Sequence, residues 1–176
     1  MMEDVVLVDD NNNEIDTAPK DSVHTKDTPL HRAFSCFIFN DNKELLLTKR
    51  ALTKKTFPGI WSNTVCGHPG KGESAVDAAR RRLKDELGLV VRDLVEISPY
   101  RYRFTDQNGT VENEICPILI GFSNDNPTPH DHEVDEWKWM KWKNFLKDLK
   151  VHSNIYSPWV REEVDILSHK TPSLLS

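Results

Sequence analysis

A thiol and an imidazole lie two residues apart in the segment 61–69, which reads WSNTVCGHP. Cys66 and His68 precede a Pro-Gly dipeptide, which favours an accessible turn. Glu86 lies near the end of the charged run that follows. Thiols, imidazoles and carboxylates transfer protons, act as nucleophiles or bind metals, so this part of the chain predicts a reactive site.

Two carboxylates stand at alternate positions in the expected strand 111–122. Glu112 and Glu114 would share one face of that strand and repel each other if unpaired. Either they form a solvent-facing edge, or a cation makes their proximity favourable. Imidazoles commonly complete such a cation site, and the histidines available for it are His24, His31 and His68. Sequence spacing alone does not link them to Glu112.

A second group of possible metal ligands is the segment 130–133, which reads HDHE. Its His-x-His spacing is suitable for a metal. However, it follows the loop-forming sequence Asn-Pro-Thr-Pro, and we interpret it as part of an exposed, solvated loop.

A helix is predicted directly after the Cys66 turn. Ser74 with Asp77 is a variant of the capping box, and Gly88 is typical of a helix end. The residues expected to face the core, because they recur at three- and four-residue spacing, are Val76, Ala79, Leu83 and Leu87.

The other face of this helix carries two oppositely charged pairs at four-residue spacing. They are Arg81 with Asp85 and Arg82 with Glu86. In isolation the pattern is typical of a solvated, salt-bridged face. Its position behind the Cys66 turn favours a role in the site instead.

The remaining pattern indicates a mixed α/β protein with mostly antiparallel strands. An Asn-Gly pair at 108–109 is a strong hairpin signal. The predicted strands are 5–8, 14–16, 33–39, 45–47, 100–105, 111–122 and 136–142, with a polar, irregular segment over 18–29 and a C-terminal helix over 158–168.

Length, charge and cysteine content limit the class of protein. The 176 residues suit a single domain, and the net charge of −5 argues against nucleic-acid binding but not against a local basic pocket. There is no CxxC pair, no leader-like N-terminus and no apolar run long enough to span a bilayer. We expect a soluble cytoplasmic protein without membrane partners.

The turn and helix resemble the Nudix box. The residues on its spacing are Gly67, Glu73, Arg81, Leu83, Asp85, Glu86, Gly88 and Leu89. Two positions depart from it, because Arg82 stands where Nudix hydrolases have a metal-binding glutamate and Asp85 replaces another. The loss of a metal-binding glutamate weakens the hydrolase interpretation.

The chain more closely resembles the type I isopentenyl-diphosphate delta-isomerases, a family of the Nudix superfamily. The resemblance extends from about residue 20 to 159 and rests on several motifs in the same order. These are His24 and the segments 30–35, 49–55, 61–69, 100–103, 111–117 and 157–159.

This resemblance implies a Nudix-like α/β/α sandwich with a mixed, largely antiparallel sheet, and two metal ions. One ion, Mn²⁺, Zn²⁺ or Mg²⁺, would be held by His24, His31, His68, Glu112 and Glu114. A Mg²⁺ ion would join Glu86 to the substrate diphosphate. The basic residues that match phosphate-binding positions are Lys20, Arg50, Lys54 and Arg82.

The implied reaction converts isopentenyl diphosphate to dimethylallyl diphosphate in isoprenoid biosynthesis. Glu114, assisted by Tyr102, would protonate the alkene, and Cys66 on the opposite face would take or return the other proton. Trp61 and Trp159 would stabilise the carbocation intermediate through their indole faces.

The other cysteines and tryptophans have structural interpretations. Cys36 and Cys116 lie in apolar strands where cysteine behaves as a small hydrophobe. The tryptophans expected to pack in the core are Trp137, Trp139 and Trp142.

Two alternatives remain open, a Nudix hydrolase of a nucleoside diphosphate derivative and a non-catalytic Nudix-like binding module. The second would have no need of Cys66, Glu114 and Tyr102 together. We expect one domain over 1–176, with an N-terminal extension at 1–29 packed on it and a flexible tail at 170–176. The protein is expected to be a monomer or weak dimer.

Overall fold

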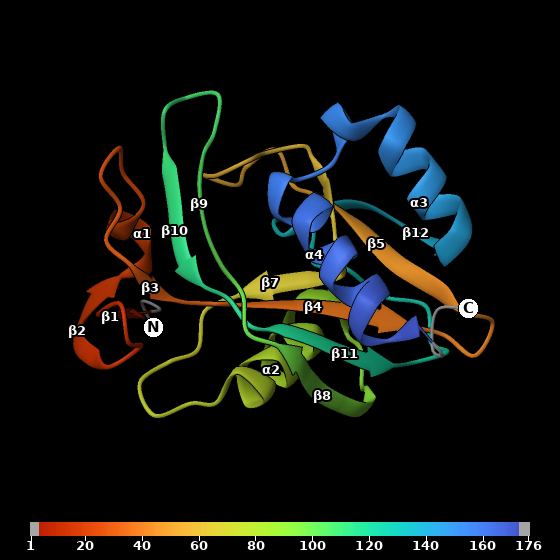
Figure 1. Cartoon of the computed structure of the whole chain (residues 1–176), viewed down its shortest axis with the longest axis horizontal. Coiled ribbons are helices and arrows are strands. Elements are labelled where there is room, and N and C mark those ends of the chain that lie inside the picture. The colour runs from red at the N-terminus through yellow and green to blue at the C-terminus, as the bar shows by residue number, and fades with distance from the viewer. Residues whose placement is uncertain (1–3, 173–176) are drawn as a thin grey trace.

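The computed structural model describes residues 4–172 and contains two β-sheets. Figure 1 shows the sheets side by side, with most of the helices around the larger one. The strands of the smaller sheet are β1 (Asp4–Val8), β2 (Glu14–Pro19), β3 (His31–Arg32), β9 (Arg101–Thr105) and β10 (Val111–Ile115). They lie in the order β2-β1-β3-β10-β9.

The larger sheet forms the centre of the molecule. Its strands are β4 (Phe34–Phe39), β5 (Glu44–Arg50), β6 (Trp61–Ser62), β7 (Val65–Gly67), β8 (Arg92–Ser98), β11 (Ile118–Phe122) and β12 (Val134–Lys141). Five lie in the order β12-β5-β4-β11-β8, with β6 beside β5 and β7 beside β4. Neighbouring strands are mostly antiparallel, and β4–β11 and β3–β10 are parallel.

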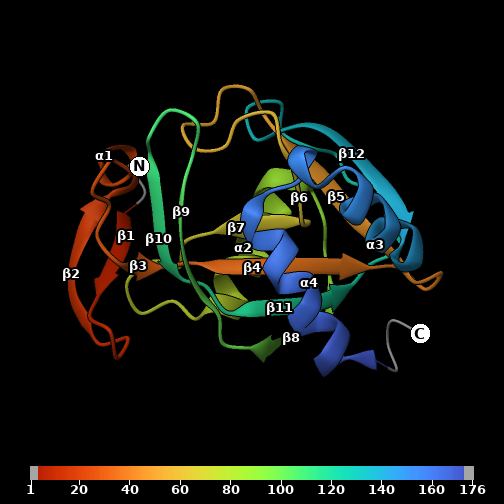
Figure 2. The same ribbon diagram turned by 45° about the horizontal axis from the view of Figure 1, so that its top comes forward.

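Helices cover both faces of the larger sheet, as Figures 1 and 2 show. α2 (Ala75–Leu87) packs on one face, and α3 (Trp142–Val151) and α4 (Pro158–Lys170), joined through a 3₁₀ turn at Ser153–Ile155, pack on the other. The short helix α1 (Lys20–Val23) lies instead beside β1 and β2 of the smaller sheet. Alternate residues of β4 enter two cores: Phe37 and Phe39 pack in the core that includes α3 and α4, whereas Cys36 and Ile38 pack with α2. The predicted α/β/α sandwich is confirmed.

Local signals at the ends of α2 behave as predicted. The Ser74 hydroxyl accepts a hydrogen bond of 3.1 Å from the Asp77 amide, and Gly88 ends the helix at φ +65°. The predicted Arg82–Glu86 pair is present, while Arg81 reaches back to Glu73 with a bidentate ion pair.

The predicted single strand at 111–122 is wrong. Pro117 has no amide hydrogen to contribute to a ladder, and the chain passes there from β10 in the smaller sheet to β11 in the larger one. β3 and β4 divide in the same way, so the parallel pairing continues across both sheets. It brings His31 opposite Glu114 and Ser35 opposite Ile118.

Several other element predictions can be compared with the structure. The strands at the N-terminus and the hairpin at Asn108-Gly109 are confirmed, whereas the segment expected to be irregular contains the end of β2 and all of α1. The predicted strand at 136–142 ends at Lys141, because Trp142 begins α3. Part of the predicted tail, residues 173–176, lies outside the described residues. Among the described helices, none is long and apolar enough to cross a membrane.

Candidate active site and metal centre

A cavity of about 670 Å³ is lined by residues from both sheets, α1, α2 and α4. Most of the residues predicted from the sequence line it. They are Lys20, His24, Arg50, Lys54, Cys66, His68, Arg82, Tyr102, Glu112, Glu114 and Trp159. Residues that are far apart in the sequence therefore line one cavity.

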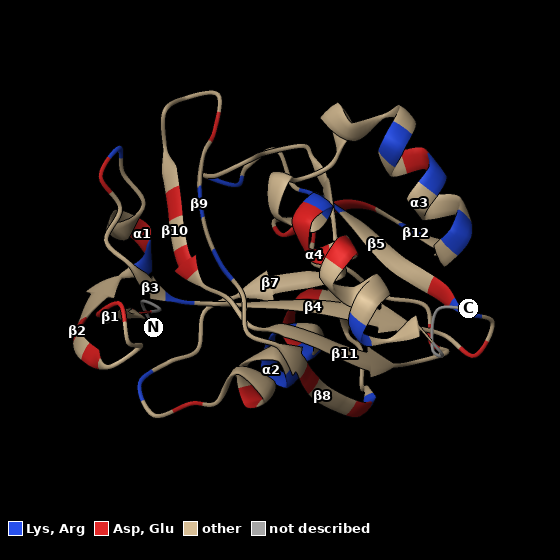
Figure 3. Ribbon diagram, viewed as in Figure 1, with Lys and Arg blue, Asp and Glu red and all other residues tan. Residues whose placement is uncertain are grey.

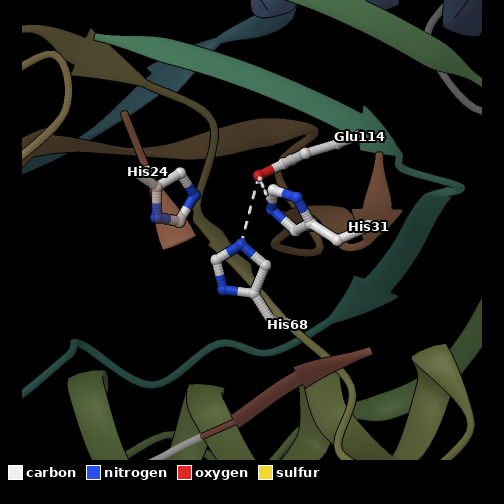
Figure 4. Close-up of side chains that lie close together, drawn as sticks. All are labelled: His24, His31, His68 and Glu114. Carbon is white, nitrogen blue, oxygen red and sulfur yellow. Dashed lines mark hydrogen bonds and ion pairs between the residues drawn. The ribbon is translucent and has the colours of Figure 1, made fainter. Parts of the chain in front are cut away.

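Three imidazoles surround one carboxylate beside the cavity, as Figure 4 shows. His24, His31, His68 and Glu114 each place one ligand atom within 4.8 Å of the others. Glu114 Oε1 lies 3.1 Å from His68 Nε2 and 3.3 Å from His31 Nε2. His31 itself is fully buried behind the cavity wall.

The chemistry of this cluster fits a divalent metal ion. His24 Nε2 and His68 Nδ1 are buried without a hydrogen-bond partner among the described residues, which is costly unless something binds there. Burial lowers the pKa of His24 to about 4 and also lowers the pKa of His68, so both rings are neutral near pH 7. Neutral imidazoles with one carboxylate form a common metal-binding donor set.

Glu112 and Glu114 stand side by side on β10, where Figure 3 shows acidic bands. Both are buried, with 5% and 4% exposure, which excludes the solvent-facing alternative. The Tyr102 hydroxyl lies 3.1 Å from Glu112 Oε2 and 2.5 Å from Glu114 Oε2, and Thr56 donates to Glu112 Oε1 at 2.5 Å. Glu112 therefore lies next to the four-ligand cluster without being part of it.

The surroundings of Glu112 and Glu114 shift the pKa values of the two carboxyls in opposite directions. Burial and the neighbouring Glu114 raise the pKa of Glu112. Although burial acts the other way, contacts with His31 and His68 hold the pKa of Glu114 well below its usual range. Two adjacent carboxyls with pKa values driven apart are a typical arrangement for acid–base chemistry.

Cys66 reaches the same cavity from β7. Its thiol donates to Asn63 Oδ1 at 3.1 Å, and burial raises its pKa, so the protonated form is stable at neutral pH. Cys36 and Cys116 are buried in strands, as predicted, and are not among the described residues lining the cavity.

Asn63 is a residue whose role the sequence did not reveal. Its side-chain nitrogen donates to Ser35 Oγ at 2.9 Å and to two backbone carbonyls, and its oxygen accepts from Ser62 and Trp159 as well as from Cys66. Its presence within the segment 61–69 was the available signal. Asn63 fixes the direction of the thiol hydrogen.

Basic side chains gather on one wall of the cavity. Lys20, Arg50, Lys54 and Arg82 all line it. Burial lowers the pKa of Lys54 to about 8. Such a concentration of buried or half-buried cations suits a multiply charged anion.

Glu133 corrects the interpretation of the segment 130–133. His130, Asp131 and His132 are exposed, as expected for a solvated loop, but Glu133 lines the cavity and forms ion pairs with Lys54 and with Arg82, the latter at 3.3 Å. The His130 amide donates to the Glu86 carbonyl and so holds this loop against the end of α2. Nothing in the local sequence indicated that contact.

Of Glu86, Trp61 and Trp159, only Trp159 is among the described residues that line the main cavity. Glu86 is buried, bonds to Arg82 Nε at 2.6 Å and lines a small adjoining cavity that also touches Cys66. Trp159 lines the main cavity and stacks on Tyr102 with ring centroids 5.8 Å apart. Trp61 is not among the described lining residues, and its ring lies 4.1 Å from Lys138 Nζ.

Together these groups place two sets of side chains that can exchange protons, the Cys66 thiol and the Tyr102–Glu114 pair, in one cavity with Trp159 and several basic side chains. Of the three tryptophans predicted to pack in the core, Trp142 is buried there, whereas Trp137 and Trp139 are half-buried and pack against the core from outside.

Comparisons with known proteins identify relatives over nearly the whole chain. Residues 29–161 match the NUDIX domain model. The chain is 48% identical over 164 residues to an isopentenyl-diphosphate Delta-isomerase of Saccharopolyspora erythraea, covering 93% of this chain and 84% of that protein. A protein of the same name from Corynebacterium glutamicum is 48% identical over 166 residues, covering 91% and 88%.

Solved structures support the fold at lower sequence identity. DR0079 from Deinococcus radiodurans superposes with a TM-score of 0.73 at 14% identity, covering 96% of this chain and 99% of that one. A MutT protein from Methanosarcina mazei Go1 gives 0.63 at 19% identity, covering 82% and 95%. The chain therefore belongs to the Nudix family and, within it, to the isopentenyl-diphosphate Delta-isomerases.

Proposed function

We propose that this protein converts isopentenyl diphosphate to dimethylallyl diphosphate, for isoprenoid biosynthesis, by adding one proton and removing another. The observation that carries the proposal is the presence of Cys66 and the Tyr102–Glu114 pair in one cavity with the basic wall and the histidine cluster. A hydrolase would need the glutamate that Arg82 replaces. A binding module would need neither proton-transfer centre.

Glu114 and Cys66 are the proposed acid and base. Glu114, connected to Tyr102 at 2.5 Å, would give a proton to the terminal alkene carbon. Cys66 would take a proton from the carbon on the other side of the resulting cation, or return it in the reverse direction. A divalent ion bound to the histidine cluster supplies a positive charge that makes a proton on the neighbouring carboxyl more acidic.

Trp159 is the side chain best placed to stabilise the carbocation. Its indole is 1% exposed, stacks on Tyr102 and lines the cavity, and the Arg50 guanidinium lies over its ring, 5.6 Å from the centroid. A desolvated indole stabilises a cation by about 2 kcal/mol. Trp61 would act from outside the cavity wall.

The basic wall would hold the diphosphate. Lys20, Arg50, Lys54 and Arg82 supply positive charge, and the diphosphate oxygens would replace Glu133 as the partner of Lys54 and Arg82. We assign a diphosphate-bound Mg²⁺ to Glu86, and Mn²⁺, Zn²⁺ or Mg²⁺ to the histidine cluster with Glu112 beside it. Arginine in place of a metal-binding glutamate favours holding the diphosphate over cleaving it.

The test is to incubate the purified protein with isopentenyl diphosphate and Mg²⁺, Mn²⁺ or Zn²⁺ and to separate the products. Dimethylallyl diphosphate with its diphosphate intact is expected from the wild type, and Cys66→Ala and Glu114→Gln should lose turnover while keeping the fold. Release of phosphate would support the hydrolase alternative. No product with any of the three metals would refute the proposal.

We extend the proposal to the setting of the protein. It would act in the cytoplasm as a monomer or weak dimer, as one domain over 1–176 with residues 1–29 packed on it, and without nucleic-acid or membrane partners. Sedimentation at micromolar concentration tests the oligomeric state, and a stable trimer or larger assembly would contradict it.

A further inference from the structure

A buried carboxyl lies behind the cavity wall and has no role in the reaction described above. Glu163 in α4 is 0% exposed. Its Oε2 accepts a hydrogen bond of 2.8 Å from Ser35 Oγ, and its Oε1 has no hydrogen-bond partner among the described residues. No ion pair with a cation accompanies Glu163 in the described part of the chain. An unpaired buried carboxylate is strongly destabilising, so this group is expected to hold a proton or to have a function.

Ser35 connects Glu163 to Cys66. Ser35 in β4 is the register partner of Cys66 in β7, and its hydroxyl oxygen lies 3.8 Å from Cys66 Sγ. Cys66 is among the described residues lining the cavity, whereas Glu163 is not. Glu163 therefore reaches the cavity through the Ser35 hydroxyl.

The hydrogen bonds around Ser35 allow two arrangements. Ser35 Oγ accepts from the Asn63 amide nitrogen at 2.9 Å and has a single hydrogen to donate. When Glu163 is ionised, that hydrogen points to Glu163 and the Cys66 thiol donates to Asn63. When Glu163 carries a proton and donates it to Ser35, the Ser35 hydrogen is released to point at the sulfur.

We propose that Glu163 is a positioning residue that exchanges a proton with Cys66 through the Ser35 hydroxyl. The inference rests on the proposed isomerase function, in which Cys66 accepts a proton from the substrate. To prepare it, the thiol hydrogen first turns from Asn63 Oδ1 to Ser35 Oγ. The Cys66 S–H bond then breaks as an O–H bond forms at Ser35 Oγ. The original Ser35 hydroxyl proton passes to Glu163 Oε2. A thiol and a carboxylate become a thiolate and a carboxylic acid, with no change in net charge.

The surroundings of Glu163 suit this exchange. Burial raises its pKa to about 8, and the charges of Glu114 and Glu162 act in the same direction. Both forms of the carboxyl are therefore accessible near neutral pH. After the exchange, the Cys66 thiolate lies beside the neutral Ser35 hydroxyl. Glu163 is then neutral as well, so no second negative charge lies behind Ser35.

The first experiment compares steady-state kinetics of Glu163→Gln and Glu162→Gln. The glutamine at 163 keeps the volume and the acceptor for Ser35 but cannot carry the proton. We expect kcat to fall about 100-fold with KM changed less than twofold, in line with the loss of a proton-transfer partner. Glu162, an exposed neighbour bonded to Tyr100, is the matched control and should leave kcat unchanged. Wild-type kcat in Glu163→Gln would overturn the inference.

A double-mutant cycle with Ser35→Ala separates the relay from simple packing. If Ser35 and Glu163 act as one path, the double variant should be no slower than Ser35→Ala alone. Independent losses that multiply would show that Glu163 does not act through Ser35 and would overturn the inference.

An infrared measurement without substrate keeps the test independent of isomerase activity. In the difference spectrum of wild type minus Glu163→Gln, we expect the carbonyl band of a protonated carboxylic acid, which loses intensity as the pH rises through about 8 and shifts in frequency in Ser35→Ala. A band that is missing even at about pH 5, or unchanged at about pH 10, would overturn the inference, because Glu163 could then not both accept and release a proton. If the wild type did not isomerise the substrate, the proposed function would fail, while the band would still report the proton on Glu163.

Discussion

The Tyr102 hydroxyl bridges the two buried carboxyls of the site, 3.1 Å from Glu112 and 2.5 Å from Glu114. Tyr102→Phe removes that bridge while keeping the ring that stacks on Trp159. We expect kcat to fall between about 10- and 100-fold with little change in KM, because the hydroxyl acts on the proton donor rather than on the diphosphate.

Tyr100→Phe is the matched control for this change. Tyr100 precedes β9, and its hydroxyl donates to the exposed Glu162. Equal losses of kcat in the two variants, measured side by side, would contradict a special role for Tyr102.

The raised pKa of Glu163 has a consequence for stability. Its value of about 8 exceeds the ordinary 4.5, so the folded protein binds this proton more tightly than the unfolded chain does. The tighter binding of this proton stabilises the folded protein. Its contribution to the free energy of unfolding is complete below about pH 4.5 and is lost as the pH rises through about 8. The titratable groups whose charges act on Glu163, or are acted on by it, are Cys66, Tyr100, Glu114, Cys116 and Glu162.

Glu163→Gln should therefore gain stability relative to the wild type as the pH increases. Urea unfolding at about pH 5 should give similar free energies for the two proteins, and at about pH 9 the variant should be more stable. A difference that stays constant across this range would show that the pKa is not raised.

At the level of elements, α2 carries Arg82 and Glu86 into the site and is ended by Gly88. Gly88 has φ +65°, and a Cβ there would clash with Thr128 Oγ1. Gly72 has φ +75°, with nothing within 4 Å of a Cβ. Gly72→Ala should cost about 1 kcal/mol of unfolding free energy from backbone strain, and Gly88→Ala about 2–4 kcal/mol because the clash adds to it.

Urea denaturation of both variants measures this difference. Equal losses of stability would mean that the Thr128 side chain turns away at no cost and that no clash adds to the strain at position 88.

Elements with local signals were predictable from the sequence. The capping of α2 and the turn at Asn108-Gly109 depend on neighbouring residues, and the structure confirms both. The division of the predicted strand at Pro117 was not predictable, since it depends on which sheet each half joins. The same distant pairing places His31 beside Glu114.

At the level of the whole molecule, the histidine cluster joins residues directly after α1 and β7 to residues in β3 and β10, and these side chains come together only in the folded chain. Metal binding should therefore stabilise the fold. At a free Mn²⁺ or Zn²⁺ concentration of 100 times the Kd, the gain is about 2.7 kcal/mol. We expect the Tm of the wild type to rise with added metal and the Tm of His24→Ala to respond much less.

His132→Ala is the control for metal bound elsewhere. His132 is exposed and belongs to the His-x-His segment that we interpret as a solvated loop. Its variant should keep the full metal-dependent increase in Tm. If His132→Ala lost the metal-dependent increase in Tm and His24→Ala kept it, the metal would bind at the exposed loop and not at the histidine cluster.

Site residues that belong to family motifs were predictable from the sequence. Site residues whose roles depend on contacts between distant parts of the chain were not. Cys66, Tyr102 and Glu114 were identified from motifs before their proximity was visible. Glu133 and Glu163 were not, because neither belongs to a recognisable spacing and each gains its meaning from a residue at least 50 positions away. Burial of an acidic side chain cannot be seen in a charged stretch of helix such as the one containing Glu163.

The central claim is that Glu114 and Cys66 move protons at two different carbons of one substrate. The direct measurement is NMR of isopentenyl diphosphate incubated in deuterated water with metal and the wild type, Glu114→Gln or Cys66→Ala. We predict dimethylallyl diphosphate carrying deuterium for the wild type and neither conversion nor deuterium uptake beyond a trace for the variants. Conversion without deuterium uptake, or full turnover by either variant, would contradict the claim.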